Sequence, residues 1–247
     1  MKKHIPNSLT ATNLFLGCVA VLFIVQGHIW PAAICVGGSL IADFFDGFAA
    51  RILKVSSPIG KELDSLADMV TFGFVPGLIL ARLIRVSGGY EFLPTNWEAS
   101  WEVWSMGIGF LVTVFSALRL AKFNLDERQS DAFYGVPTPA NTMLIFSLWI
   151  IVSLQPDHWI SATLNRPWVW MMISLLSAYW LIMDVKLLAL KFKSFAFRPN
   201  LFRYVLIGLS IILIISFQYV AVPFIFLLYL ALSLIANQVE SSDKGNA

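Results

Sequence analysis

Four aspartates at regular, short spacings carry the strongest chemical signal in the sequence. Asp43 and Asp46 are three residues apart and Asp64 and Asp68 are four apart, so each pair would share one face of a helix. The surrounding residues are apolar enough to lie in a bilayer, where an unpaired carboxylate is costly and usually functional. Oxygen ligands without histidine or thiolate favour a hard cation such as Mg²⁺ or Mn²⁺.

The two pairs are expected to face one another across a short connection, VSSP at 55–58. A single intramembrane aspartate is more often a hydrogen-bonding or proton-relay residue than a metal ligand, but four at paired helical spacing indicate a pocket. Four carboxylates around one ion would be a heavy negative load. Two divalent cations are therefore expected, an arrangement typical of phosphoryl-transfer sites.

Small and basic residues between the pairs favour a phosphate ligand. Gly47 and Gly60 would let the backbone approach a ligand closely, and Arg51 has the fork geometry that matches phosphate oxygens. Together with the metal ions they predict a pyrophosphate pocket. Two simpler interpretations stay open, in which the glycines are helix-packing contacts and Arg51 is a snorkelling residue at a helix end.

The composition is that of a polytopic membrane protein. Hydrophobic residues make up 58% of the 247 residues, charged residues only 13%, and the mean hydropathy is +0.75, whereas soluble domains carry about 25% charged residues. The two cysteines lie in apolar runs and do not indicate a disulfide framework. The net charge of +2 is small and does not indicate a nucleic-acid partner.

We expect an all-α integral membrane protein with about eight transmembrane helices, given that each span needs about 20 apolar residues. The predicted spans are 11–27, 29–53, 61–86, 103–123, 137–155, 168–190, 201–217 and 219–237, the last two being either a helical hairpin or one broken unit.

The chain is expected to form one membrane domain with short polar ends. We predict an N-terminal interfacial segment at 1–10, a single membrane domain at 11–237 and a cytoplasmic polar tail at 238–247. The basic start followed by an apolar run resembles a secretory signal. Because the polar segment IPNSLTATN separates the two and a second span follows at once, we interpret it as a retained first span.

The distribution of basic residues predicts the orientation. With alternating spans, every lysine and arginine except Arg82, Arg85 and Arg166 falls on the side of the N-terminus. By the positive-inside rule that side is cytoplasmic. All four aspartates would then lie at the cytoplasmic face, and the protein would be integral to the cytoplasmic membrane.

The motif itself resembles the signature of the CDP-alcohol phosphatidyltransferase family. The resemblance implies a membrane enzyme that transfers a phosphatidyl group from CDP-diacylglycerol to an alcohol and releases CMP. It also implies a core of six membrane helices, a homodimer, two Mg²⁺ or Mn²⁺ ions held by the four aspartates, and Asp68 as the catalytic base. Every fixed position is filled in Asp43-x2-Asp46-Gly47-x2-Ala50-Arg51-x8-Gly60-x3-Asp64-x3-Asp68.

Three flanking runs resemble the phosphatidylserine synthase branch of that family. They are IPNSLTATN at 5–13, SALRLAKFN at 116–124 and YGVPTPAN at 134–141. With the motif they cover most of residues 5–141, and they imply L-serine as the acceptor. Lys122 stands where that branch more often has arginine, a change that keeps the positive charge.

Candidate substrate contacts follow from the motif and these runs. The acceptor candidates are Arg119, Lys122 and Asn124, since the serine carboxylate needs cations, although the two basic residues also fit the positive-inside pattern. The CDP-diacylglycerol candidates are Gly47, Ala50, Arg51 and Gly60 from the motif, with Thr10 and Asn13, for which helix capping is an equal alternative.

Two other functions remain open on the sequence. The same chemistry is possible with glycerol 3-phosphate or an inositol phosphate as acceptor. Such a phosphorylated acceptor would need a denser cluster of cations at the pocket. A cation- or proton-coupled transporter would also bury carboxylates, but no internal repeat supports it. The histidine-nucleophile route to phosphatidylserine is excluded, because His4, His28 and His158 are not followed by lysine two positions on.

Overall fold

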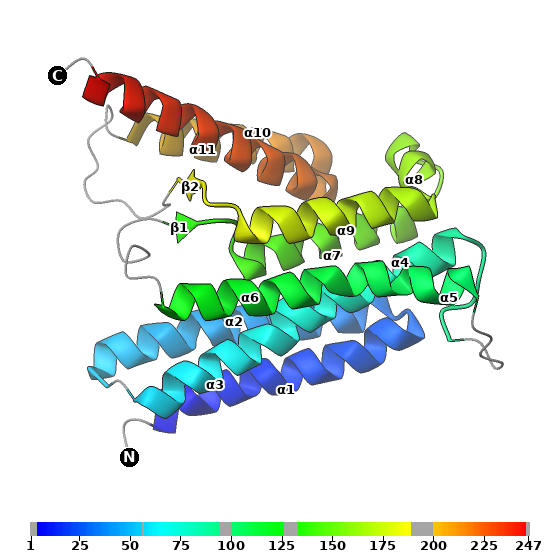
Figure 1. Cartoon of the computed structure of the whole chain (residues 1–247), viewed down its shortest axis with the longest axis horizontal. Helices are drawn as coiled ribbons and strands as arrows, with labels where there is room; N and C mark the ends of the chain where they lie inside the picture. The colour runs from blue at the N-terminus through cyan, green and yellow to red at the C-terminus, as the bar shows by residue number, and fades with distance from the viewer. Residues whose placement is uncertain (1–3, 56, 94–99, 126–132, 189–199, 246–247) are drawn as a thin grey trace.

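The computed structural model describes residues 4–55, 57–93, 100–125, 133–188 and 200–245, with side chains described as far as residue 239 except that of Phe133. Within these ranges the regular secondary structure is helical, apart from one short antiparallel pairing of β1 (Phe133–Tyr134) with β2 (Lys186–Leu187). Figure 1 shows the long helices lying roughly alongside one another. The prediction of an all-α membrane protein is confirmed.

The helices follow the order that the hydropathy predicts. Several spans are continuous units in which the backbone hydrogen bonding changes between α-helical, 3₁₀ and π segments. The elements are α1 (His4–Gln26), α2 (Ile29–Leu53), α3 (Pro58–Asp68), η1 (Met69–Phe74), α4 (Val75–Ser87), α5 (Trp101–Ser105), η2 (Met106–Phe110), α6 (Leu111–Leu125), α7 (Thr138–Leu154), α8 (Trp159–Leu164), α9 (Pro167–Ile182), α10 (Leu201–Phe217), η5 (Gln218–Val220) and α11 (Ala221–Gly245).

The span count agrees with the prediction. Five helical units are long and apolar enough to cross a bilayer, and α7 and α9 are shorter apolar helices. The last unit, residues 201–239, is a hairpin: α10 and α11 pack against each other and the chain reverses at η5, where Gln218 has φ 51°. Counting this hairpin as two, the described residues supply eight spans.

Three predicted boundaries differ from the structure by more than a few residues. The last span was expected to end at residue 237, but α11 continues as a helix to Gly245. The span expected at 168–190 ends at Ile182, where Met183 becomes extended (φ −58°, ψ 138°) and leads into β2. The apolar run past residue 182 concealed this turn, because Asp184 and Lys186 interrupt it only singly. At the other end, α1 begins at His4 rather than residue 11, so residues 4–10 are helical and continuous with the first span.

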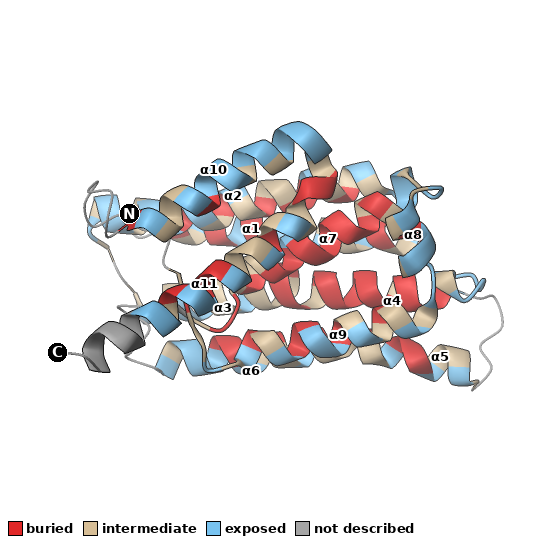
Figure 2. Ribbon diagram, turned by 90° about the horizontal axis from the view of Figure 1, so that it is seen from above, coloured by how far each residue is buried: buried red, intermediate tan, exposed pale blue. Residues whose placement is uncertain are grey.

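One continuous helix, α3–η1–α4, forms the centre of the bundle. In its most apolar window 72% of the residues are buried, against 17% to 39% in the other four long units. Figure 2 shows α4 as a largely buried helix surrounded by its neighbours. Because this helix also carries Asp64 and Asp68, the two aspartates are attached to the most enclosed element of the fold.

Small residues allow the central helix to pack closely against α6 and η2. Gly73, Gly77 and Ala81 repeat at four-residue intervals, the spacing of close helix contacts in membranes. A Cβ on Gly77 would overlap the hydroxyl of Thr113, and one on Gly109 would lie 2.5 Å from the Ala81 nitrogen. Side chains larger than hydrogen therefore do not fit at these contacts.

The C-terminal helix holds the chain segment that follows α9. The Tyr229 hydroxyl donates to the Leu188 carbonyl (3.2 Å), and the Leu188 N–H donates to Ser233 Oγ (3.0 Å). The Asn237 amide donates to the Lys186 carbonyl (2.5 Å). Three residues at one-turn intervals on α11 thus fix β2 and its continuation to the bundle.

Replacing Gly109 by leucine is expected to destabilise the bundle, because the side chain would meet the backbone of α4. Overpacking typically costs about 1–3 kcal/mol and more where backbone must move. The thermal midpoint of the detergent-solubilised protein, followed by size-exclusion analysis after heating, should fall by several degrees. Gly107→Leu is the matched control, since no described atom lies within 4 Å of a Cβ there. Equal midpoints for the two variants would contradict the tight α4–η2 contact.

Candidate functional site

Three of the four motif aspartates converge from two helices. Asp43 near the end of α2 and Asp64 and Asp68 on α3 each offer a carboxylate oxygen, and these oxygens lie within 4.8 Å of one another. All three residues are half-buried. Such a compact set of carboxylate oxygens suits a hard divalent cation, so the donor set fits the metal that the sequence analysis expects.

Asp46 lies beside this group rather than in it. Its side chain is buried, and its Oδ2 accepts a hydrogen bond of 2.6 Å from the Thr10 hydroxyl on α1. Asp46 also lines, together with Asp64, a neighbouring pocket. Asp64 thus belongs to both the triad and the pocket, which makes the two parts one continuous site.

The pocket is a cavity of about 230 Å³ at the junction of α1, α2 and α3. The described residues that line it are small, polar or charged, with Pro6 and Val55 as the larger apolar ones. They combine the motif residues Asp46, Gly47, Ala50, Gly60 and Asp64 with Pro6, Asn7, Thr10, Val55, Ser57 and Lys61.

The first turn of α3 shapes one wall of the pocket. Ser57 caps the helix by accepting the Gly60 N–H at 3.1 Å, and Pro58 occupies the first helical turn. A Cβ on Gly60 would lie 2.9 Å from Ser57 Oγ and 3.0 Å from Asn7 Oδ1. Gly47 differs, since no described atom lies within 4 Å of its Cβ position. Gly60 is therefore needed for close chain approach, and Gly47 leaves open space.

Asn13 lies behind the aspartates and is not part of the pocket lining. It is fully buried, and its Nδ2 donates to Asp68 Oδ1 at 3.3 Å. Its backbone carbonyl accepts the hydroxyls of Ser39 (3.1 Å) and Thr71 (3.2 Å). The structure thus separates the two α1 candidates: Thr10 reaches Asp46 and the pocket, whereas Asn13 orients Asp68. No pattern in the sequence indicated the contact between Asn13 and Asp68.

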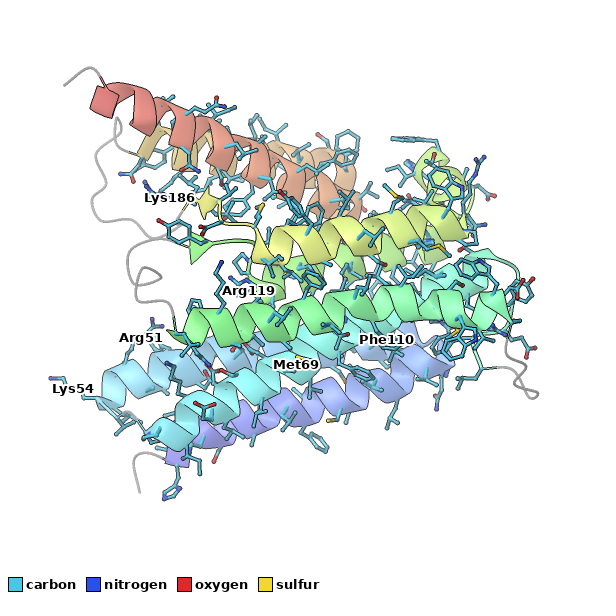
Figure 3. All side chains as sticks on the ribbon, viewed as in Figure 1. Arg51, Lys54, Met69, Phe110, Arg119 and Lys186 are labelled. Atoms are coloured by element: carbon cyan, nitrogen blue, oxygen red, sulfur yellow. The ribbon has the colours of Figure 1, made fainter. Side chains whose placement is uncertain are left out.

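The remaining candidates differ in their surroundings. Arg51 is exposed at the end of α2, one turn beyond Gly47 and outside the pocket lining (Figure 3). Lys122 is exposed on the last turn of α6. Asn124 donates to Ser65 Oγ at 2.7 Å, and its carbonyl accepts from the Lys61 ammonium at 3.1 Å. Asn124 therefore joins the end of α6 to α3.

Arg119 is the acceptor candidate that the structure buries. Its Nε has no hydrogen-bond partner among the described residues, and its guanidinium lies 5.9 Å from the Phe123 ring centre. The guanidinium lies within electrostatic range of Asp68, and Tyr229 of α11 is a further neighbour. In Figure 3 its side chain extends from α6 on the side of β1 and β2. Arg119 is thus a buried cation near the aspartates, and its Nε–H has no partner among the described residues. Such a group is suited to binding an anionic ligand.

Tyr229 is a site neighbour that sequence reasoning missed. It lies in an apolar span without any motif, and only the return of α11 along the bundle brings its hydroxyl near Arg119. A single polar ring in such a span usually indicates an interfacial residue, so no signal in the sequence distinguished it.

Comparison with known proteins gives a consistent picture. The model of the family described as CDP-alcohol phosphatidyltransferase matches residues 3–237. A CDP-diacylglycerol–serine O-phosphatidyltransferase of Helicobacter pylori (strain ATCC 700392 / 26695) is 30% identical over 211 residues, which are 85% of this chain and 81% of that protein. The enzyme of the same name from Bacillus subtilis (strain 168) is 31% identical over 59% of this chain and 75% of its own length.

A more distant match is the archaetidylserine synthase of Methanothermobacter thermautotrophicus, 26% identical over 59% of this chain and 58% of that protein. The family match spans nearly the whole chain, including the aspartate triad, the pocket and Arg119. The all-α membrane bundle described above agrees with it. The chain therefore belongs to the CDP-alcohol phosphatidyltransferase family.

Proposed function

We propose that the protein transfers the phosphatidyl group of CDP-diacylglycerol to L-serine, giving phosphatidylserine and CMP. The observation that carries the proposal is the convergence of Asp43, Asp64 and Asp68 beside a pocket lined by the rest of the motif. Relatives named as CDP-diacylglycerol–serine O-phosphatidyltransferases support serine as the acceptor.

The aspartates are the residues that would hold divalent cations. Asp43, Asp64 and Asp68 form the compact group, and Asp46 lies next to it at the pocket wall. We propose two ions, Mg²⁺ or Mn²⁺, because the four negative charges of the carboxylates exceed the two positive charges of a single divalent ion. When bound, such ions neutralise negative charge on the pyrophosphate as the leaving group departs.

The pocket is proposed to receive the CDP end of the donor lipid. Gly47 leaves space for it, and the N-terminal turn of α3 contributes a favourable helix dipole for phosphate together with the Lys61 side chain. Thr10 and Asn7 provide polar atoms for the nucleotide. Arg51, exposed one turn beyond Gly47 and outside the pocket lining, is proposed to contact phosphate from there.

The acyl chains have an apolar surface next to the pocket. Phe44, Phe45 and Phe48 are exposed on α2 and pack against one another beside the motif residues. Aromatic side chains of this kind are compatible with lipid contact. The donor would thus remain in the bilayer while its head group enters the site.

The acceptor is proposed to bind between Arg119 and Asp68. The Nε of Arg119, which has no partner among the described residues, would pair with the serine carboxylate. Asn13 holds one oxygen of Asp68, and the other would take the proton from the serine hydroxyl. The serine oxygen then bonds to the phosphatidyl phosphorus, the bond from that phosphorus to the bridging oxygen breaks, and CMP leaves.

The charge distribution and the fold support a proposal for the location of the active site. Arg51 lies in the last turn of α2 and Lys122 in the last turn of α6, and the Lys61 ammonium donates to the Asn124 carbonyl. These cations therefore lie at the end of the bundle that holds the aspartates. By the positive-inside rule, these cations favour a cytoplasmic location for that end. We therefore propose an active site at the cytoplasmic face of the cytoplasmic membrane, in a homodimer as the family resemblance implies.

Asp68→Asn is expected to lower turnover by about 10²–10⁴-fold, the usual contribution of a general base, while binding of CDP-diacylglycerol persists. The measurement is CMP release by purified protein given CDP-diacylglycerol, Mn²⁺ and serine, with donor binding measured separately. Asp157→Asn, at an exposed position remote from the motif, is the control. Full activity of Asp68→Asn would exclude the proposed base.

Arg119→Gln is expected to raise the serine KM by about 10- to 100-fold, because a hydrogen bond to a charged group contributes about 1.5–3 kcal/mol. The KM for CDP-diacylglycerol should change little. Arg166→Gln, at an exposed cation beside the start of α9, is the control and should have a small effect.

An acceptor panel makes this test specific for the carboxylate. Wild-type protein should prefer serine over serinamide, and Arg119→Gln should lose that preference. If both proteins discriminate equally, Arg119 does not bind the carboxylate. If glycerol 3-phosphate or an inositol phosphate supports faster CMP release than serine, the acceptor assignment is wrong.

A further inference from the structure

The central helix contains a π-helical segment directly after Asp68. In η1 (Met69–Phe74) the turns are wider than in α3 and α4 on either side, and the Val75 N–H bonds to the Val70 carbonyl, five residues earlier. π segments account for well under 1% of residues and occur frequently at functional sites. Here the segment separates the aspartates from the buried part of the same helix.

Pro76 gives a physical reason for the wide turn. Proline has no N–H, and in a regular helix its ring would press against the carbonyl four residues earlier, that of Phe72.

Two threonines from other helices donate hydrogen bonds to backbone carbonyls of η1. Thr113 on α6 donates to the Gly73 carbonyl at 3.0 Å, and Thr142 on α7 donates to the Phe72 carbonyl at 3.2 Å.

The Thr142 hydroxyl also lies 2.9 Å from the Thr138 carbonyl of its own helix. Its single hydrogen is therefore shared between two acceptors, whereas among the described residues the Thr113 hydroxyl donates to the Gly73 carbonyl alone. Thr113 is accordingly expected to hold η1 more strongly than Thr142.

The opposite side of η1 is bonded to the residue that holds Asp68. Thr71 donates to the Asn13 carbonyl, and the Asn13 amide donates to Asp68. Gly17, one turn further along α1, has no room for a Cβ because Thr71 lies against it. The wide turn is thus held from α1, α6 and α7 at once.

We propose that Thr113 and Thr142 are positioning residues for the aspartate site. One additional residue in a turn rotates the flanking helical faces by about 100° relative to each other. By holding the π turn, the two hydroxyls keep Asp64 and Asp68 facing Asp43 while α4 keeps its apolar face in the core. The inference rests on the proposed function for its catalytic meaning, but the geometry at the aspartates is testable without it.

The test uses the full-length protein in detergent with Thr113→Val, Thr142→Val and the double variant. Valine keeps the shape of threonine and removes the hydroxyl, while Thr113→Ser and Thr142→Ser retain it. Ser147→Ala is the control, because this buried hydroxyl on α7 bonds within its own helix, to the Leu144 carbonyl.

The main measurement is Mn²⁺ binding to the substrate-free protein by electron paramagnetic resonance, with backbone amide exchange over residues 69–75 beside it. We expect the Thr113→Val and double variants to bind Mn²⁺ about tenfold more weakly, since loss of a group that orients metal ligands costs about 10- to 100-fold in affinity. Thr142→Val should weaken Mn²⁺ binding less, because its hydroxyl is shared between two carbonyls. Exchange over 69–75 should accelerate, the serine variants should restore both values, and Ser147→Ala should change neither.

A purely stabilising role predicts another pattern. The valine variants would then lose thermal stability while the folded fraction binds Mn²⁺ with unchanged affinity, and that result would overturn the proposal. If the double variant does not fold, the two single variants decide by the same criterion. Wild-type protein that binds Mn²⁺ but releases no CMP would refute the proposed function and leave this comparison valid.

Discussion

The structure depends on the placement of four carboxylates at one end of a membrane bundle. Each is costly there unless a hydrogen bond, a cation or water compensates it. Two of the four carboxylates are compensated by other helices among the described residues. Asp46 accepts a hydrogen bond from Thr10 of α1, and Asp68 accepts one from Asn13 of α1 and is attracted by the buried charge of Arg119 on α6. The first span and the fourth are therefore as much a part of the site as the two helices that carry the motif.

The motif made the aspartate cluster predictable, because helical spacing and a short connection leave few ways to arrange the two pairs. Periodicity and charge counting likewise predicted the spans, since a bilayer restricts both length and charge. The difference between Asp46 and the other three aspartates was not predictable. It depends on the Thr10 hydroxyl, which lies thirty-six residues away in the chain.

The other features that the sequence did not predict are contacts between spans that lie far apart in the chain. Asn13 was predicted as a nucleotide contact or a cap, and the structure adds that its amide donates to Asp68. Asn124 was predicted as an acceptor contact, and the structure adds that it joins α6 to α3 through Ser65. Tyr229 carried no signal at all. In each case the polar group is explained by its partner on another helix, and a single sequence does not reveal such pairings.

The bonds from α11 to β2 have a consequence for exchanging parts between family members. Tyr229, Ser233 and Asn237 bond to the backbone of Leu188 and Lys186 rather than to their side chains. These three bonds follow the path of the backbone, while the Leu187 side chain of the same segment is buried in the core. A chimaera that replaces the last span must therefore keep the three polar residues in register with residues 186–188, and a chimaera that replaces the segment must keep its buried apolar side chain.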